Sequence, residues 1–147
     1  MSDSPVDILL VEDSPDDIEF TLRTLNKHLV TTRIDVVRDG AEALDYLFCT
    51  GPHSTRSIEL KPRLVLLDLK LPKVNGLEVL RKIKSDPRSR TIPVVVLTSS
   101  SEDRDIAEAY QLGVNSYIVK PVDFKQFDEA IRQVGLYWLL LNYRPAK

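Results

Sequence analysis

The chain has few cysteines, no dense basic block and no long apolar run, and each of these absences excludes a class of protein. Its 147 residues include a single cysteine, Cys49, so an internal disulfide is impossible and a reducing, cytoplasmic location is expected. Basic and acidic residues nearly balance, at 20 and 22, without a dense basic block, so we expect no nucleic-acid partner. The longest apolar run, residues 136–141, is far below the roughly 20 residues that a membrane span needs, so we expect no membrane partner. The first residues do not resemble a signal peptide.

What remains is the composition of a folded protein. Hydrophobic residues make up 43% and charged residues 29% of the chain, which is enough to form a buried core. At about 100 to 200 residues per domain, the length allows one domain. We therefore expect one domain over residues 1–147, with a flexible N-terminus at residues 1–6 and a last helix with a C-terminal extension at residues 123–147.

Short apolar runs rich in β-branched residues recur along the chain and are typical of strands buried on both faces. They lie at residues 8–11, 34–37, 64–67, 94–97 and 117–119. Helical patterns separate them, and the first begins at Ser14 and Pro15, a capping residue followed by a residue suited to the first turn. Alternating strands and helices predict a parallel sheet with right-handed crossovers, which is a doubly wound α/β fold in three layers.

Polar side chains follow four of the five predicted strands. They are Glu12 and Asp13 after the first, Asp68 after the third, Thr98 after the fourth, and Lys120 with Pro121 after the fifth. Ligands of such folds bind beyond the carboxyl ends of the strands, so these side chains are expected to share one site. Taken singly, each acid is more often a turn former or a helix cap. Their joint placement favours the shared site.

Three carboxylates at one site predict a bound cation. Two like charges about 4 Å apart repel by on the order of 4 kcal/mol at an effective dielectric near 20. Mg²⁺ relieves such repulsion with oxygen ligands, taking one or two carboxylates and keeping waters or phosphate oxygens. With Mg²⁺ and Lys120 supplying positive charge, Asp68 is the candidate nucleophile that becomes an aspartyl phosphate.

The same residues resemble a known family. The matching segments are ILLVED at 8–13, LVLLDLKLP at 64–72 with NG at 75–76, VVVLTS at 94–99 and YIVKP at 117–121. Together they closely resemble the receiver domain of bacterial two-component response regulators. The resemblance implies a five-stranded parallel sheet with the flavodoxin-like strand order 2-1-3-4-5.

The resemblance also implies a role for each matching residue. Asp68 would accept a phosphoryl group from a sensor histidine kinase, with Asp13, Asp68 and the backbone carbonyl of Lys70 binding Mg²⁺ and Glu12 acting through metal-bound water. Lys120, the Thr98 hydroxyl and the Ser99 amide would contact the phosphoryl group. Tyr117 would turn inward from solvent when Thr98 moves, and the bond before Pro121 would be cis. The protein would then be a signalling phosphoprotein that catalyses only its own phosphorylation and dephosphorylation.

A finer resemblance is to the single-domain regulators of bacterial and cyanobacterial phytochromes. It depends on the long connection at residues 50–62 and on the C-terminal extension. It implies a phytochrome kinase as partner and no output domain. Two positions depart from the common pattern, because the acidic pair is Glu-Asp instead of Asp-Asp and Lys70 is a cation two residues after the acceptor, so the phosphoryl lifetime does not carry over.

The last helix carries more apolar residues than one buried face requires. A first row with three- and four-residue spacing explains packing on the sheet. A second row is left over, made of Leu136, Tyr137, Leu139, Leu140 and Tyr143. We expect an extended helix over about residues 124–143 whose second row forms a homodimer interface, the alternative being that this row folds back on the sheet edge.

Two other functions compete with the signalling reading. A phosphatase of the haloacid dehalogenase type also uses a strand-end Asp and Mg²⁺, but it requires a second Asp two residues later, where this chain has Lys70. A receiver that binds partners without being phosphorylated usually lacks the acceptor, the lysine or an acidic-pair member, and none is missing here.

Overall fold

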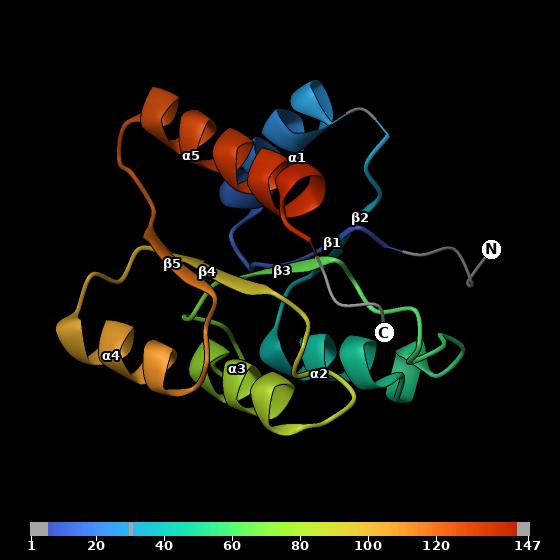
Figure 1. Ribbon diagram of the computed structural model, residues 1–147. Helices are drawn as coiled ribbons and strands as arrows, with labels where there is room; N and C mark the ends of the chain where they lie inside the picture. The colour runs from blue at the N-terminus through green and yellow to red at the C-terminus, as the bar shows by residue number, and fades with distance from the viewer. Residues whose placement is uncertain (1–5, 30, 144–147) are drawn as a thin grey trace.

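The computed structural model describes residues 6–29 and 31–143 and contains one parallel sheet between two layers of helices (Figure 1). The strands are β1 (Ile8–Val11), β2 (Ile34–Val37), β3 (Leu64–Leu67), β4 (Val94–Thr98) and β5 (Ser116–Val119). The helices are α1 (Pro15–His28), α2 (Gly40–Phe48), α3 (Gly76–Ser85), α4 (Asp103–Gln111) and α5 (Phe124–Leu136). The strand order is β2-β1-β3-β4-β5 and every neighbouring pair is parallel, which confirms the predicted fold class.

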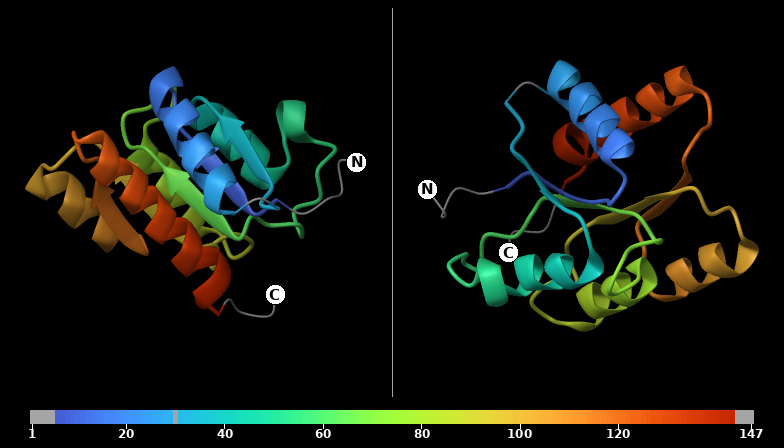
Figure 2. Two further views of the ribbon diagram at one scale, coloured as in Figure 1. Left: turned by 90° about the horizontal axis from the view of Figure 1, so that it is seen from above. Right: turned by 180° about the vertical axis from the view of Figure 1, so that it is seen from behind.

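Each face of the sheet buries its own apolar core (Figure 2). Alternate strand residues such as Leu9 and Val65 pack with α2, α3 and α4, whereas Ile8 and Leu64 pack with α1 and α5. β1 and β3 are buried along their whole length because helices cover the side chains on both faces of these strands. This double coverage explains why the strands are short, nearly unbroken apolar runs.

The first turn of α1 begins directly after β1. The Ser14 hydroxyl accepts a hydrogen bond from the Asp17 amide, and Pro15 occupies the first helical position, as the sequence predicts. The far end of the helix packs closely on α5, where a Cβ at Gly135 would come within 2.8 Å of the Leu25 side chain. The two helices are therefore held against the same sheet face, and the start of α1 lies at the edge where the strands end.

The loop after β3 is fixed by a glycine. A Cβ added to Gly76 would lie 2.2 Å from the carbonyl oxygen of Asp68, a distance at which backbone atoms clash. Only glycine therefore allows α3 to begin this close to the end of β3. Asn75 caps the same helix by accepting from the Glu78 amide. The NG pair at 75–76 thus defines where Asp68 sits.

The end of the chain differs from the expected long α-helix. The regular helix ends at Leu136 and continues as a π-helical turn over Tyr137–Leu141, closed by the Asn142 amide on the Tyr137 carbonyl. The wider turn changes the direction of the side chains that follow it. Leu139 is consequently buried at 5% exposure, and Leu136 is half-buried against the same core, so these two members of the second row fold back on the sheet, as the alternative to the homodimer interface expects.

The connection between α2 and β3 packs on α2. The Arg56 guanidinium lies 3.7 Å from the centre of the Tyr46 ring, donates to the Tyr46 carbonyl and reaches the Leu60 carbonyl at 3.1 Å. His53 Nε2 lies 3.1 Å from Glu42 Oε2. This long connection is therefore anchored by charged and aromatic contacts along its length.

The predicted flexible N-terminus lies largely outside the described residues, as does the end of the extension at 144–147. Val6, the last residue of the segment predicted to be flexible, is 2% exposed and belongs to the core, so this part of the prediction is wrong. Its burial next to β1 explains the difference. Within the described ranges, no helix has the length and apolar character to cross a bilayer.

Candidate functional site

The carboxyl edge of the sheet brings three predicted site residues into direct contact. Lys120 Nζ lies 2.7 Å from Glu12 Oε1 and 3.3 Å from Asp68 Oδ2. β1, β3 and β5 deliver these residues from separate parts of the chain. All three side chains are at most 10% exposed, so the ion pairs form in a setting largely shielded from water.

A fourth charged side chain completes this cluster. Asp17 Oδ2, from the first turn of α1, lies 2.6 Å from Lys120 Nζ. An acid in the first turn of a helix interacts favourably with the helix dipole, and this is the ordinary role for a residue at such a position. The sequence also contains an indication that Asp17 belongs to the site, because the first turn of a helix that follows β1 directly must lie at the same edge of the sheet as Glu12.

Burial and charge shift the proton affinities in the cluster. Burial raises the pKa of Glu12 to about 7, the Asp68 charge adds to this rise, and Lys120 opposes it. Burial alone would lower the pKa of Lys120, but its bonds to Asp17 and Glu12 outweigh that effect and raise the pKa above its usual value. Lys120 is therefore a permanent cation that faces more negative charge than it neutralises.

The excess negative charge fits a divalent cation. Carboxylate oxygens of Glu12, Asp13 and Asp68 all lie within 4.8 Å of one another, with Asp13 exposed and the other two buried. Oxygen donors of this kind suit Mg²⁺, which also retains waters that an exposed ligand can share. The predicted donor set thus fits the group. The Lys70 carbonyl stays a prediction as a ligand, although the Lys70 amide donates to Asp68 Oδ1 at 3.3 Å.

The end of β4 forms the opposite wall of the site. Thr98 is fully buried, and its hydroxyl oxygen accepts from the Ser100 amide at 3.4 Å, while Ser99 is exposed. The Ser100 hydroxyl in turn donates to Asp105 Oδ2 at 2.6 Å. Ser100 and Asp105 were missed from the sequence, where they are ordinary polar residues near a helix start.

Two predictions for β5 need correction. The Tyr117 ring is half-buried and its hydroxyl donates to the Ser100 carbonyl at 2.9 Å, so this side chain is not a free group in solvent. No cis peptide bond occurs among the described residues, so the predicted cis bond before Pro121 is wrong. Trans is the ordinary preference before proline, and Lys120 reaches its carboxylates from the trans backbone.

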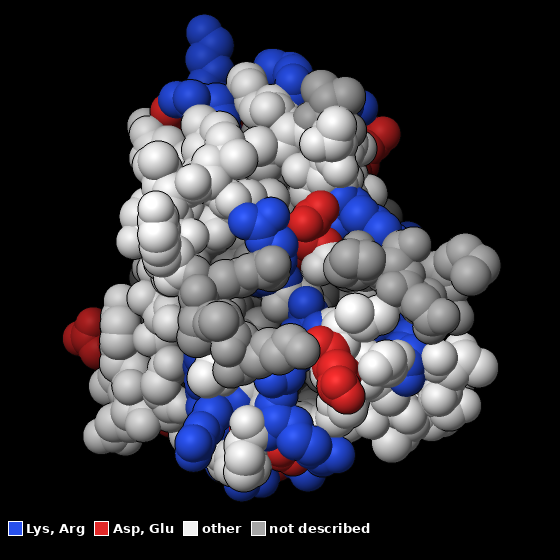
Figure 3. All heavy atoms as spheres, turned by 45° about the vertical axis from the view of Figure 1, so that its right-hand side comes forward, with Lys and Arg blue, Asp and Glu red and all other residues white. Residues whose placement is uncertain are grey.

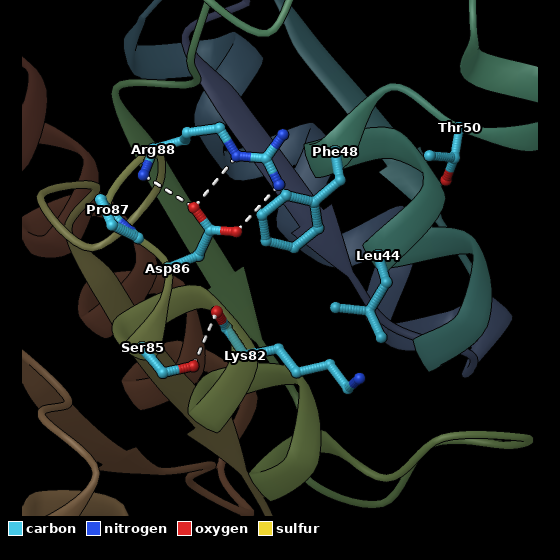
Figure 4. A pocket seen from close by; sticks show the side chains of 8 residues that line it. All are labelled: Leu44, Phe48, Thr50, Lys82, Ser85, Asp86, Pro87 and Arg88. Atoms are coloured by element: carbon cyan, nitrogen blue, oxygen red, sulfur yellow. Dashed lines mark hydrogen bonds and ion pairs between the residues drawn. The ribbon is translucent and has the colours of Figure 1, made fainter.

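A separate pocket lies away from this edge (Figure 4). It measures about 410 Å³ and lies between the last turns of α2 and α3 and the loop after α3. Phe48 and Leu44 line one side, and Arg88 on the other side is held by two bonds to Asp86. These helix ends lie at the amino edge of the parallel sheet, so the pocket has no part in the carboxylate site.

Comparison with known proteins identifies the family. The model of the response regulator receiver domain matches residues 8–132. The chain is 44% identical over 144 residues to a probable methanogenesis regulatory protein, FilR2, of Methanothrix harundinacea, covering 98% of this chain and 90% of that protein. It is 37% identical over 145 residues to the response regulator Rcp1 of Synechocystis sp., covering 99% and 97%.

Solved structures show the same relationship. The phosphorylated cyanobacterial phytochrome response regulator RcpA superposes with a TM-score of 0.90 at 40% identity, over 97% of this chain and all of that one. The Mn²⁺-bound form of Rcp1 gives 0.89 at 37% identity, over 97% and 100%. The bacteriophytochrome response regulator RtBRR gives 0.76 at 52% identity, over 97% and 86%.

The family match and the lysine–carboxylate cluster point the same way. A matched segment that includes all five strands carries the acidic pair, the strand-end Asp and the lysine at one edge of the sheet. The chain therefore belongs to the response regulator receiver domain family and is similar to the response regulators of bacterial and cyanobacterial phytochromes.

Proposed function

We propose that the protein is a phosphorelay response regulator that accepts a phosphoryl group on Asp68. The observation that supports this most directly is the contact of Lys120 Nζ with Asp68 Oδ2 at 3.3 Å. That contact places a buried cation beside the oxygen that would attack. Phosphoryl transfer depends mainly on positioning and charge neutralisation, which this arrangement provides.

The step is a transfer between two side chains. A carboxylate oxygen of Asp68 forms a bond to the phosphorus of a kinase phosphohistidine, and the phosphorus–nitrogen bond breaks, returning its electron pair to the imidazole. Asp68 is thereby converted to an acyl phosphate whose negative charge is on the phosphoryl oxygens. Lys120 and the Thr98 hydroxyl are the side chains proposed to contact these oxygens.

Glu12, Asp13 and Asp68 are the residues proposed to hold Mg²⁺, together with the Lys70 carbonyl. A bound Mg²⁺ supplies charge neutralisation at the transferred group. The Mn²⁺-bound form of Rcp1 is a related protein with a divalent cation, which supports this assignment. Asp13 contributes an exposed carboxylate through which the cation can enter from solvent.

The proposed partner is a sensor histidine kinase, with a phytochrome kinase favoured by the similarity to RcpA and RtBRR. Signalling would then pass through protein contacts, without catalysis on a separate substrate. A single domain over residues 1–147 and a cytoplasmic location stay predictions from the sequence.

The test is to incubate the protein with acetyl phosphate and Mg²⁺ and to weigh it intact. We expect one phosphoryl adduct on the wild-type protein and none on Asp68→Asn, which keeps the shape and removes the nucleophile. Asp13→Asn keeps the acceptor Asp68 but lacks a proposed Mg²⁺ ligand, so added Mg²⁺ should no longer increase the yield of its phosphoryl adduct. Phosphate release over many turnovers would instead indicate a phosphatase, and an unchanged wild-type mass would indicate a binding-only receiver.

A further inference from the structure

The Lys120 ammonium has three hydrogens, and the structure gives it three carboxylate acceptors. Their distances from Nζ are unequal, at 2.6 Å for Asp17, 2.7 Å for Glu12 and 3.3 Å for Asp68. The cation is therefore held most closely by the first turn of α1 and least closely by the residue assigned as phosphoryl acceptor. Its hydrogen-bonding capacity is fully used in this state.

A phosphoryl group on Asp68 would take over the 3.3 Å contact to Asp68, and any further bond from Lys120 to the phosphoryl oxygens would have to displace Glu12 or Asp17. The inference rests on the proposed function, in which Lys120 contacts the phosphoryl oxygens. Glu12 is 4% exposed and would lose its partner where water cannot replace it, whereas Asp17 is 28% exposed and can be hydrated when it is released. Asp17 is thus the partner whose loss costs least.

We propose that Asp17 is a latch that ties Lys120 to α1 and limits its approach to Asp68 until the phosphoryl group arrives. It is a positioning residue, since it acts through the lysine and not on the reacting atoms. When Lys120 turns to the phosphoryl oxygens, α1 loses its side-chain tie to β5 at the first turn. Phosphorylation of Asp68 is thereby linked to the stability of the first turn of α1, which Asp17 ties to Lys120.

The neighbouring residue provides a matched control. Asp16 is in the same helical turn and carries the same charge, but it is exposed and its side chain has no partner among the described residues. A change of either acid removes one negative charge near the site and one favourable contact with the helix dipole. Only a change at Asp17 releases Lys120.

The experiment compares the wild-type protein with Asp17→Asn, Asp17→Ala and Asp16→Asn in the presence of Mg²⁺. Beryllofluoride coordinates an aspartate oxygen, mimics the tetrahedral phosphoryl group and reports a reversible equilibrium without transfer of phosphorus. Because the competing ion pair is partly exposed, both Asp17 variants should bind beryllofluoride about three- to tenfold more tightly than Asp16→Asn. Their initial rates of phosphorylation by acetyl phosphate should rise in the same order.

Amide hydrogen exchange in the first turn of α1 is a second readout. If Asp17 had only a structural role, this exchange would not respond to beryllofluoride. In the wild-type protein and in Asp16→Asn, exchange at Ile18 and Glu19 should rise when beryllofluoride binds. In the Asp17 variants, exchange at these two amides should be fast without beryllofluoride and should change little when it binds. Melting curves of all four proteins confirm that each is folded.

The outcomes separate the two proposals. Wild-type protein that takes neither beryllofluoride nor a phosphoryl group overturns the proposed function and the latch together. Wild-type protein that takes both, with Asp17 variants that match Asp16→Asn or bind more weakly, overturns the latch alone. Weaker binding would mean that Asp17 presents Lys120 to the phosphoryl group.

Discussion

Thr98 is the residue that connects the proposed acceptor to the rest of the β4–α4 loop. It is fully buried, and its hydroxyl oxygen already accepts a hydrogen bond from the Ser100 amide. Ser100 also binds the Tyr117 hydroxyl through its carbonyl and Asp105 through its own hydroxyl. A shift of the Thr98 hydroxyl towards a phosphoryl oxygen would therefore disturb several contacts of one loop residue.

We predict that Thr98→Ala is still phosphorylated on Asp68 but that its β4–α4 loop no longer responds to phosphorylation. A hydrogen bond to a charged group is worth roughly 1.5 to 3 kcal/mol, which is the energy that would favour the shifted loop. In the wild-type protein, amide hydrogen exchange at 99–102 and at Tyr117 should change on phosphorylation. In Thr98→Ala it should not.

Thr98→Ser is the control, because it keeps the hydroxyl and loses only a methyl group. Its exchange pattern should follow that of the wild-type protein. An unaltered response in Thr98→Ala would show that the hydroxyl does not carry the signal.

Lys84, in the last turn of α3, ties together elements at the amino edge of the sheet. Its Nζ donates to the carbonyl oxygens of Ile92 at 2.7 Å and Arg90 at 3.2 Å, and to Asn115 Oδ1 at 2.9 Å. Asn115 Oδ1 also accepts from the Val94 amide at 2.8 Å. One ammonium thus connects α3 with the starts of β4 and β5.

We predict that Lys84→Met lowers the free energy of unfolding by about 1 to 2 kcal/mol at pH 7, because carbonyl acceptors lose a charged donor. Burial lowers the pKa of Lys84 to about 8 in the folded protein, against a value near 10.4 for an unperturbed lysine. Between these two pH values the unfolded chain binds more protons at this residue. Wild-type stability should therefore rise with pH there, relative to Lys84→Met.

The measurement is urea unfolding at several pH values from 7 to 10.5. Lys82→Met is the matched control, since this exposed lysine is in the same helix and its side chain makes no hydrogen bond to the part of the chain that the structure describes. Its unfolding free energy should run parallel to that of the wild-type protein. A constant gap between wild-type and Lys84→Met across the range would contradict the predicted pKa effect.

The C-terminal turn leaves large apolar side chains exposed. Leu140 is 65%, Leu141 68% and Tyr143 98% exposed. On the face that Figure 3 turns forward, uncharged side chains fill much of the left side, while Lys and Arg lie along the top rim and at the lower end. Exposed apolar side chains that lie close together are typical of a protein interface.

We propose that the chain forms a homodimer through Tyr137, Leu140, Leu141 and Tyr143, the exposed members of the C-terminal turn. Leu139 is excluded from this surface because it packs in the core and its carbonyl accepts from Arg63. The interface is therefore smaller than the second row read from the sequence. Sedimentation of the full chain at tens of micromolar should show a dimer, and Leu140→Glu should be monomeric.

Tyr110→Glu is the control for this experiment. Tyr110 is a comparably exposed apolar residue, at 55%, but it lies on α4 and on the other helix layer. This variant should sediment like the wild-type protein. A monomeric full-length chain, or equal dissociation by both substitutions, would contradict the proposed surface.

The sequence alone determined the sheet and the content of its edge. Runs that are apolar at nearly every position predict strands with a helix layer on both faces, and their alternation with helical patterns predicts the parallel topology. Parallel strands end at one edge, which was sufficient to group Glu12, Asp68 and Lys120. These predictions depend on local pattern and on topology, and both can be read from the order of residues.

Only the tertiary structure decided which contacts form within that framework. The order of elements places Asp17 at the right edge of the sheet, but only the packing of α1 brings it into contact with Lys120. Ser100 joins the site through the fold of the β4–α4 loop, which its residue type does not indicate. Leu139 turns into the core because the last helix widens into a π-helical turn, which changes the phase that helical spacing assumes. Side-chain direction at an element's end depends on packing against distant parts of the chain, and residue order does not encode that packing locally.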